Sequence, residues 1–138
     1  MTETTTVLQA SQALEADHHR LDTLIDRLRG GLDLAGMTAA LDELHAALTG
    51  HFNAEERPGG LYDALGVCVP DFREPLGNLV DDHYRFAGLV RDLAQRAREA
   101  EGAAADALRA DVARLVQALG DHERREHEMV KAAVDRTA

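Results

Sequence analysis

The sequence has little of what disulfide-stabilised or β-rich proteins require. Its 138 residues include one cysteine, no tryptophan and only 4% aromatic residues. The lone Cys68 excludes an internal disulfide framework and a cysteine-rich zinc site. Strand-forming aromatic residues are few, and apolar and polar residues show no sustained alternation, which argues against β-strands. The sequence therefore favours an all-α protein.

Long apolar runs and an excess of basic residues are also missing. No run approaches the ~18 apolar residues of a membrane-spanning helix, and the opening MTETTTVLQA lacks the basic and apolar regions of a signal peptide. A net charge of −10 disfavours nucleic-acid binding, which needs clustered lysine and arginine. We therefore expect a cytoplasmic protein that binds neither membranes nor nucleic acid. No protein partner is indicated.

The length and the apolar content predict one folded domain. At about 150 residues per domain, residues 1–138 correspond to a single unit, which is long enough to bury a core without disulfides. Hydrophobic residues make up 45% of the chain, which argues against disorder despite the charge.

Glycine and proline divide the chain into four blocks, each with apolar residues three or four positions apart. This spacing predicts four helices, over about residues 7–29, 37–56, 75–99 and 106–135. Because short connections make neighbouring helices antiparallel, we expect an up-down-up-down antiparallel four-helix bundle. The one longer connection, residues 57–74, contains Tyr62 and Cys68.

Polar residues interrupt the apolar stripe of every predicted helix. Each stripe contains one histidine, and the second and fourth stripes add a glutamate one turn later. These residues are His18, His51, Glu55, His83, His122 and Glu126. Ionised glutamate is rarely buried unless it is paired or bound to a metal. A single histidine in such a stripe is more often a hydrogen-bonded core residue, so the depth of all six residues decides between the two interpretations.

The six residues are expected to lie in one layer of the bundle. At 1.5 Å per helical residue, His18 and His51 lie ~16 and ~21 Å from the first turn. His83 and His122 each lie ~25 Å from the turn at Gly102. Glu55 and His83 are both within roughly three turns of the 57–74 connection. Four imidazoles and two carboxylates in one core layer would be costly without a cation, so the sequence predicts a metal site.

The types of ligand narrow the choice of metal. Structural zinc takes four ligands, usually including sulfur, and calcium and magnesium prefer oxygen alone. Mixed histidine and glutamate around two adjacent ions in a helix bundle is typical of di-iron or di-manganese sites. We expect two bridging carboxylates, with iron as the first choice of metal and manganese as the second.

Four segments of the chain resemble the hemerythrin-like (HHE cation-binding) family. They are DHHRLDTLIDRL (17–28), HFNAEERPGGLYDAL (51–65), DDHYRFAGLV (81–90) and HERRE (122–126), and the likeness extends over about residues 14–130. The resemblance implies a non-haem di-iron centre with an oxo or hydroxo bridge. It also implies bridging carboxylates from the second and fourth helices. Carried over, the metal ligands are His18, His51, Glu55, His83, His122 and Glu126.

The chain departs from the oxygen-carrying members of that family at two places. Those members have a second histidine one turn away on the third helix, where this chain has Leu79 and Ala87. They also have an aspartate five residues after the histidine of the fourth helix, where this chain has His127. Here Glu126, four residues on, shares the face of His122 better. The missing ligand leaves a coordination position open, or filled by water, Glu56, His127 or a tyrosine.

Three functions remain open from the sequence. The departures disfavour simple oxygen carriage and favour reaction with a small molecule such as O2, NO or peroxide, with azide-like anions as further ligands. An iron-, oxygen- or redox-sensing module without turnover is the alternative. A helical interaction domain without metal is the third possibility. Whether the protein is an enzyme is undecided, and no catalytic residue is assigned.

Five other residues are expected to play smaller parts. His19 is predicted at the surface, as is His45, which flanks the stripe; Tyr62 and Tyr84 are predicted to serve packing, with hydrogen bonding to a bound ligand or a redox role as the alternative. Cys68 has no activating motif nearby and is expected to be a bystander.

Overall fold

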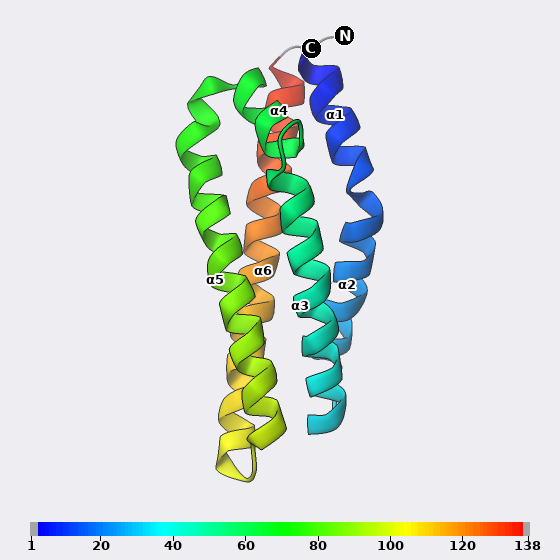
Figure 1. The fold of residues 1–138 in the computed structure, drawn as a ribbon, viewed down its shortest axis with the longest axis vertical. Coiled ribbons are helices and arrows are strands. Elements are labelled where there is room, and N and C mark those ends of the chain that lie inside the picture. Colours follow the sequence, from blue (N-terminus) through cyan, green and yellow to red (C-terminus); the bar gives the residue numbers. More distant parts are fainter. Residues whose placement is uncertain (1–2, 137–138) are drawn as a thin grey trace.

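The computed structural model describes residues 3–136, so the first two and last two residues of the expected domain lie outside the described part. Within that part the chain forms α-helices, one 3-10 turn and no strand (Figure 1). The elements are α1 (Glu3–Ala13), α2 (Glu15–Arg29), α3 (Leu34–Glu56), α4 (Leu61–Cys68), the 3-10 turn η1 (Pro70–Phe72), α5 (Arg73–Glu99) and α6 (Ala103–Asp135). The all-α prediction is confirmed.

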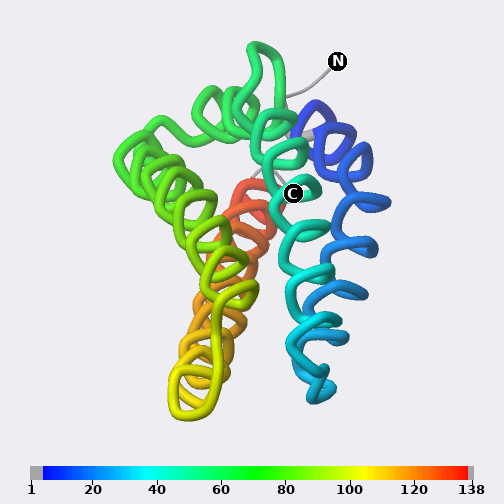
Figure 2. Tube along the Cα trace, turned by 60° about the horizontal axis from the view of Figure 1, so that its bottom comes forward, coloured from blue at the N-terminus to red at the C-terminus, as the bar shows by residue number. Residues whose placement is uncertain are grey.

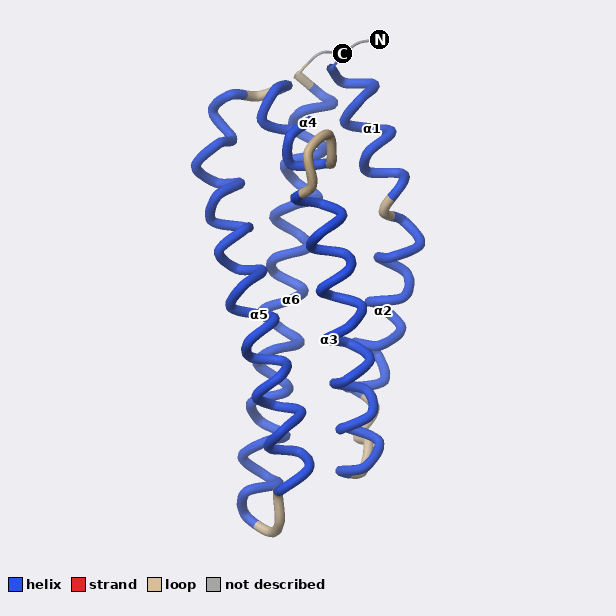
Figure 3. Tube along the Cα trace, viewed as in Figure 1, coloured by secondary structure: helices blue, strands red, loops and turns tan. Residues whose placement is uncertain are grey.

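The four long helices α2, α3, α5 and α6 form an antiparallel bundle, as expected. Short connections at residues 30–33 and 100–102 join α2 to α3 and α5 to α6 at one end (Figure 3). Seen at an angle in Figure 2, the two hairpins run along each other, and α4 crosses the opposite end. None of the helices described between residues 3 and 136 is long and apolar enough to span a bilayer.

The first arm of the bundle is two helices rather than the single helix predicted over 7–29. The break is at Leu14, whose amide donates a hydrogen bond to the Ser11 carbonyl at 3.1 Å, so that the chain turns between α1 and α2. No glycine or proline marks this position, and the apolar spacing continues through it. The sequence pattern therefore contained no signal for the break. The α1 helix packs against α4 and the end of α6.

The connection over 57–74 is more ordered than predicted, because it contains α4 and η1. The chain reverses at Gly60, where an added Cβ would lie 2.7 Å from the Ala54 carbonyl oxygen and 2.9 Å from that of Arg57. Only glycine allows this approach to the end of α3. The Asp63 carboxylate accepts a hydrogen bond from the Gly59 amide at 2.8 Å and fixes the turn. The α4 helix thus lies across the end of the bundle.

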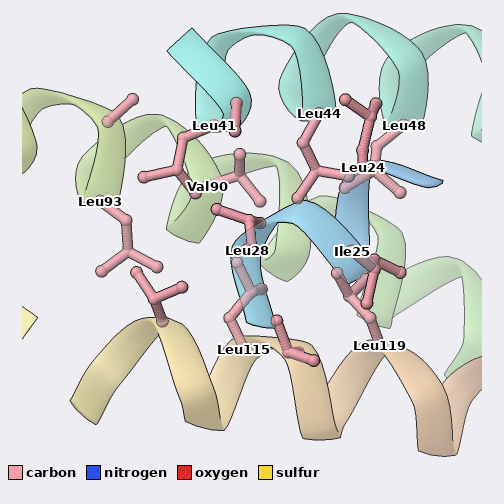
Figure 4. Packing of buried hydrophobic residues seen from close by; sticks show 14 of the residues in the cluster. Leu24, Ile25, Leu28, Leu41, Leu44, Leu48, Val90, Leu93, Leu115 and Leu119 are labelled. Atoms are coloured by element: carbon pink, nitrogen blue, oxygen red, sulfur yellow. The ribbon is translucent and has the colours of Figure 1, made fainter. Parts of the chain in front are cut away.

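Two apolar clusters fill the bundle, one on each side of a polar layer. The lower core lies among α2, α3, α5 and α6 and contains the side chains labelled in Figure 4 together with Leu21, Phe52 and Phe86. The upper core lies under α1 and α4 and includes Val7, Leu14, Leu61, Tyr62, Leu65, Leu76, Leu79 and Ala133. Each long helix therefore passes from one apolar cluster to the other, and the layer between them holds the polar residues.

Candidate metal centre

The structure brings all six predicted residues into the layer between the two cores. On α2, His18 lies between Leu14 of the upper core and Leu21 of the lower core. On α5, His83 lies between Leu79 and Phe86, which again belong to different cores. Helices α3 and α6 contribute the remaining four residues, each as a histidine and a glutamate one turn apart. The spacing that puts each histidine in the apolar stripe of its helix thus also puts it at the level of the polar layer between the two cores.

The six residues form two groups, and each group could hold a cation. One group is His18, His51, Glu55 and Glu126; the other is Glu55, His83, His122 and Glu126. Within each group, one ligand atom per residue lies within 4.8 Å of the others. Both carboxylates belong to both groups, so the arrangement suits two neighbouring cations that share Glu55 and Glu126.

All four imidazoles turn their Nε2 atoms toward the two carboxylates. The Nε2 atoms of His51 and His83 lie 3.3 and 3.4 Å from the oxygens of Glu55. Those of His18 and His122 lie 3.8 and 4.0 Å from the oxygens of Glu126. His83 and His122 also face each other, with their Nε2 atoms 3.1 Å apart.

Three of the imidazoles have a carboxylate on their outer nitrogen. His51 Nδ1 lies 3.4 Å from Asp17, His83 Nδ1 lies 2.7 Å from Glu56, and His122 Nδ1 lies 3.3 Å from Asp82. A carboxylate accepts a hydrogen bond from a protonated Nδ1, which leaves the Nε2 lone pair free to face the layer. Outer carboxylates orient metal-binding histidines in this way and raise their basicity.

Asp82 is itself held firmly. Arg125 donates to its carboxylate at 2.9 Å, and Arg85 donates to the other oxygen. Its charge is therefore compensated although the residue is buried, with 7% of its surface exposed. Arg125 of α6 thus joins this network.

The centre of the layer contains hydrogen-bond acceptors with almost no donors. Glu55 is completely buried, and neither carboxylate oxygen receives a hydrogen bond from any described residue. The inward Nε2 atoms of His51, His83 and His122 are acceptors too, because each Nδ1 faces a carboxylate. The Tyr62 hydroxyl is the exception: it donates to Glu126 at 2.8 Å and lies 2.9 Å from His83 Nε2. A buried concentration of acceptors is costly unless a cation joins them, so the residues present fit bound metal.

Burial lowers the pKa values of three of the histidines, which is the direction that metal binding requires. It lowers the pKa of His18 to about 4 and that of His83 to about 3, with the neighbouring imidazoles adding to the effect. Burial also lowers the pKa of His122. These side chains are neutral at pH 7, which is the form that binds a metal.

The two glutamates are shifted the other way. Burial raises the pKa of Glu55 to about 7. It raises the pKa of Glu126 well above its usual range, and the charge of the adjacent Glu55 adds to the rise. Without a cation, the two carboxylates therefore tend to hold protons. A bound cation reverses this tendency, because it favours the ionised form.

Aromatic side chains from the lower core fix the two imidazoles of the second group. The Phe52 ring stacks on His83 at 3.8 Å with an interplanar angle of 4°. Phe86 meets the His122 ring edge-on at 5.4 Å. Closely packed rings hold the imidazoles at one angle, which pre-organises their nitrogens for a ligand role.

The other residues considered from the sequence lie apart from the layer or at its margin. His19 is exposed and His45 is half-buried, and His127, a possible extra ligand, is exposed. Glu56 contacts the outer nitrogen of His83, so it supports that imidazole. Tyr84 is 74% exposed and serves no packing. Half-buried Cys68 donates a weak hydrogen bond to the Ala133 carbonyl.

Sequence reasoning missed two supporting aspartates, although a signal for them was present. Asp17 and Asp82 each come directly before a stripe histidine, His18 and His83. One residue corresponds to about 100° of helical rotation, so each aspartate faces the neighbouring helix. There it meets a different histidine, His51 or His122.

Comparison with known proteins gives one finding. The family model described as the hemerythrin HHE cation binding domain matches residues 9–134. No curated protein and no solved structure matches the chain. The matched region contains every residue of the polar layer described above. Since the match extends over nearly the whole chain, this protein belongs to the hemerythrin HHE cation-binding domain family.

Proposed function

We propose that residues 1–138 form one hemerythrin-like domain that holds two non-haem iron ions and binds or reacts with a small molecule such as O2, NO or peroxide. The observation that carries the proposal is the pair of four-residue groups that share both carboxylates. When bound, an iron pair supplies one-electron redox chemistry and open coordination positions for a small ligand.

The proposed ligands divide evenly between the two ions. His18 and His51 would hold the first ion, and His83 and His122 the second. Glu55 and Glu126 would bridge the pair and, together with an oxo or hydroxo bridge, would offset part of its charge. Each ion then has two histidines and shared carboxylates, a donor set typical of non-haem iron with open positions. Manganese is the second choice.

Among residues 3–136, the side chain of Tyr62 is the one hydrogen-bond donor within the layer. Leu79 and Ala87 occupy the places where a further histidine of α5 would reach the second ion, and Leu79 is buried in the upper core. The Tyr62 hydroxyl lies beside His83 and Glu126 instead. A phenol can donate a proton or a hydrogen bond to a small molecule held there. This supports a reactive centre rather than simple oxygen carriage.

A sensing role without turnover is the second candidate, and the origin of the ligands favours it. The six residues come from all four long helices. Metal that binds only the folded bundle adds stability by mass action, so iron occupancy would control how firmly the helices pack. A partner could read that difference.

Metal analysis with the optical spectrum tests the proposal. We expect about two iron ions per chain, with near-ultraviolet oxo-to-iron charge-transfer bands and no haem Soret band. Glu55→Ala and Glu126→Ala should each lose at least one iron per chain, whereas His19→Ala, at an exposed neighbour of His18, should retain both. One tightly bound zinc and no iron would refute the assignment. Sustained peroxide consumption would distinguish a redox enzyme from a sensor.

A further inference from the structure

We propose that small ligands reach the metal centre through the groove between α4 and α5, and that the Tyr62 ring closes the inner end of this groove. The inference rests on the proposed function and adds the route and the charge preference of its ligand.

The groove is a cavity of about 420 Å³. Leu76, Gly77 and Val80 of α5 form one wall, and Tyr62 and Gly66 of α4 lie opposite. A water molecule in the liquid occupies about 30 Å³, so the groove has room for several molecules the size of peroxide or azide. Its walls are mostly apolar, and the polar side chains on them are Tyr62, Asp63 and Arg73.

Tyr62 extends from the groove to the metal centre. The residue lines the groove, and its hydroxyl lies within 2.9 Å of both Glu126 and His83. Only 7% of its surface is exposed, so the ring fills the space between the two. Rotation of this one side chain would join the groove to the side of the layer where α5 supplies no second histidine.

The rival route begins at His18, whose side chain is 26% exposed. That opening is bordered by acidic groups: the charges of Asp17 and Asp22 act on His18, and Glu123 lies near Asp22 and His51. On a chain of net charge −10, these carboxylates repel anions.

The mouth of the α4–α5 groove has one positive and one negative side chain, Arg73 and Asp63. Arg73 lines it and has no ion-pair partner among residues 3–136. The one carboxylate in the groove, Asp63, accepts a hydrogen bond from the Gly59 amide. A free guanidinium raises the local concentration of anions. Small monoanions are therefore repelled less at the groove than at the acidic opening beside His18, whereas uncharged molecules are repelled at neither.

A pair of glycine substitutions on α5 tests the route. At Gly77 an added Cβ meets nothing within 4 Å, so Gly77→Leu fills the groove without disturbing the helix. Gly88 is the matched control: it lies three turns further along the same face, also has free space, and does not line the groove. In the iron-loaded protein, we expect Gly77→Leu to slow azide binding about tenfold and Gly88→Leu to leave the rate within about twofold.

Two further variants examine the gate and the charge at the mouth. Tyr62→Ala removes the ring and should speed the binding of both azide and NO. Arg73→Gln should slow the binding of azide about threefold at low salt and leave the binding of NO unchanged, because only the anion is attracted.

For Gly77→Leu, the association and the dissociation of azide should slow together. The azide affinity and the resting iron spectrum therefore stay as in the unmodified protein.

The outcomes separate the two proposals. If Gly77→Leu binds azide at the unmodified rate while holding both irons, the route is refuted and the proposed function stands. If the unmodified protein binds no iron, or its iron spectrum does not respond to azide or NO, the proposed function fails, and the route fails with it.

Discussion

Replacing Glu55 with glutamine should stabilise the metal-free protein while it weakens or abolishes metal binding. The Glu55 side chain is completely buried, and neither oxygen receives a hydrogen bond from a described residue. An ionised carboxylate in that position is costly, whereas a glutamine of the same shape is neutral. Its amide can also donate to the Nε2 atom of His51 or His83, each within 3.4 Å of the carboxylate.

The pKa of Glu55 sets the size and the pH window of this effect. Burial raises that pKa from 4.5 to about 7. The fold therefore favours the protonated carboxyl: the penalty is absent below pH 4.5, grows as the pH rises and is complete above pH 7. At 1.36 kcal/mol per pH unit, the penalty reaches about 3 kcal/mol. Glu55→Gln should recover that amount, or roughly 10 °C in Tm.

Urea unfolding, followed by circular dichroism after treatment with a chelator, measures the effect. The free energy of unfolding of Glu55→Gln should exceed that of the unmodified protein at pH 8, and the difference should vanish near pH 4.5. Titration of the histidines affects both proteins alike and cancels in the comparison. Glu43→Gln, on the exposed face of the same helix, is the control and should change stability by less than about 0.5 kcal/mol. Equal or lower stability of Glu55→Gln at pH 8 would refute the reasoning.

Three further results are expected. Because burial raises the pKa of Glu55 to about 7 and raises that of Glu126 well above its usual value, metal binding to the metal-free protein at pH 6 should release protons. For each proton released, the metal affinity should fall about tenfold as the pH falls by one unit. Calorimetry in buffers of different ionisation enthalpy measures the protons released, and proton-independent binding would contradict the prediction. Asp82→Asn removes the charge opposite His122 Nδ1 and should lower metal affinity about 10- to 100-fold in competition with a chelator, with the helical content unchanged. Leu115→Ala, in the lower core, should lower the free energy of unfolding by about 2–5 kcal/mol and leave the iron spectrum unchanged. Loss of the metal in this variant would show that the metal centre depends on the packing of the lower core.

The sequence was sufficient for the fold class and for bringing the six polar residues together. An apolar residue at every third or fourth position is a local feature of a helix, and a bundle of such helices needs only short turns between them. The depth of a side chain in the bundle follows from the number of residues between it and the end of its helix, so the sequence alone places His18 and His83 in the same layer. The break at Leu14 could not be predicted, because no residue there opposes a continuous helix.

Only the tertiary structure decided which groups support the imidazoles and what closes the centre. The pairing of Asp17 with His51 and of Asp82 with His122 joins different helices, and the relative rotation of two helices is set by side-chain packing over their whole length. The position of Tyr62 depends on the reversal at Gly60, which brings α4 over the end of the bundle. The local sequence thus determined the helices and the level of the polar layer, whereas packing between distant segments determined its contacts and its access.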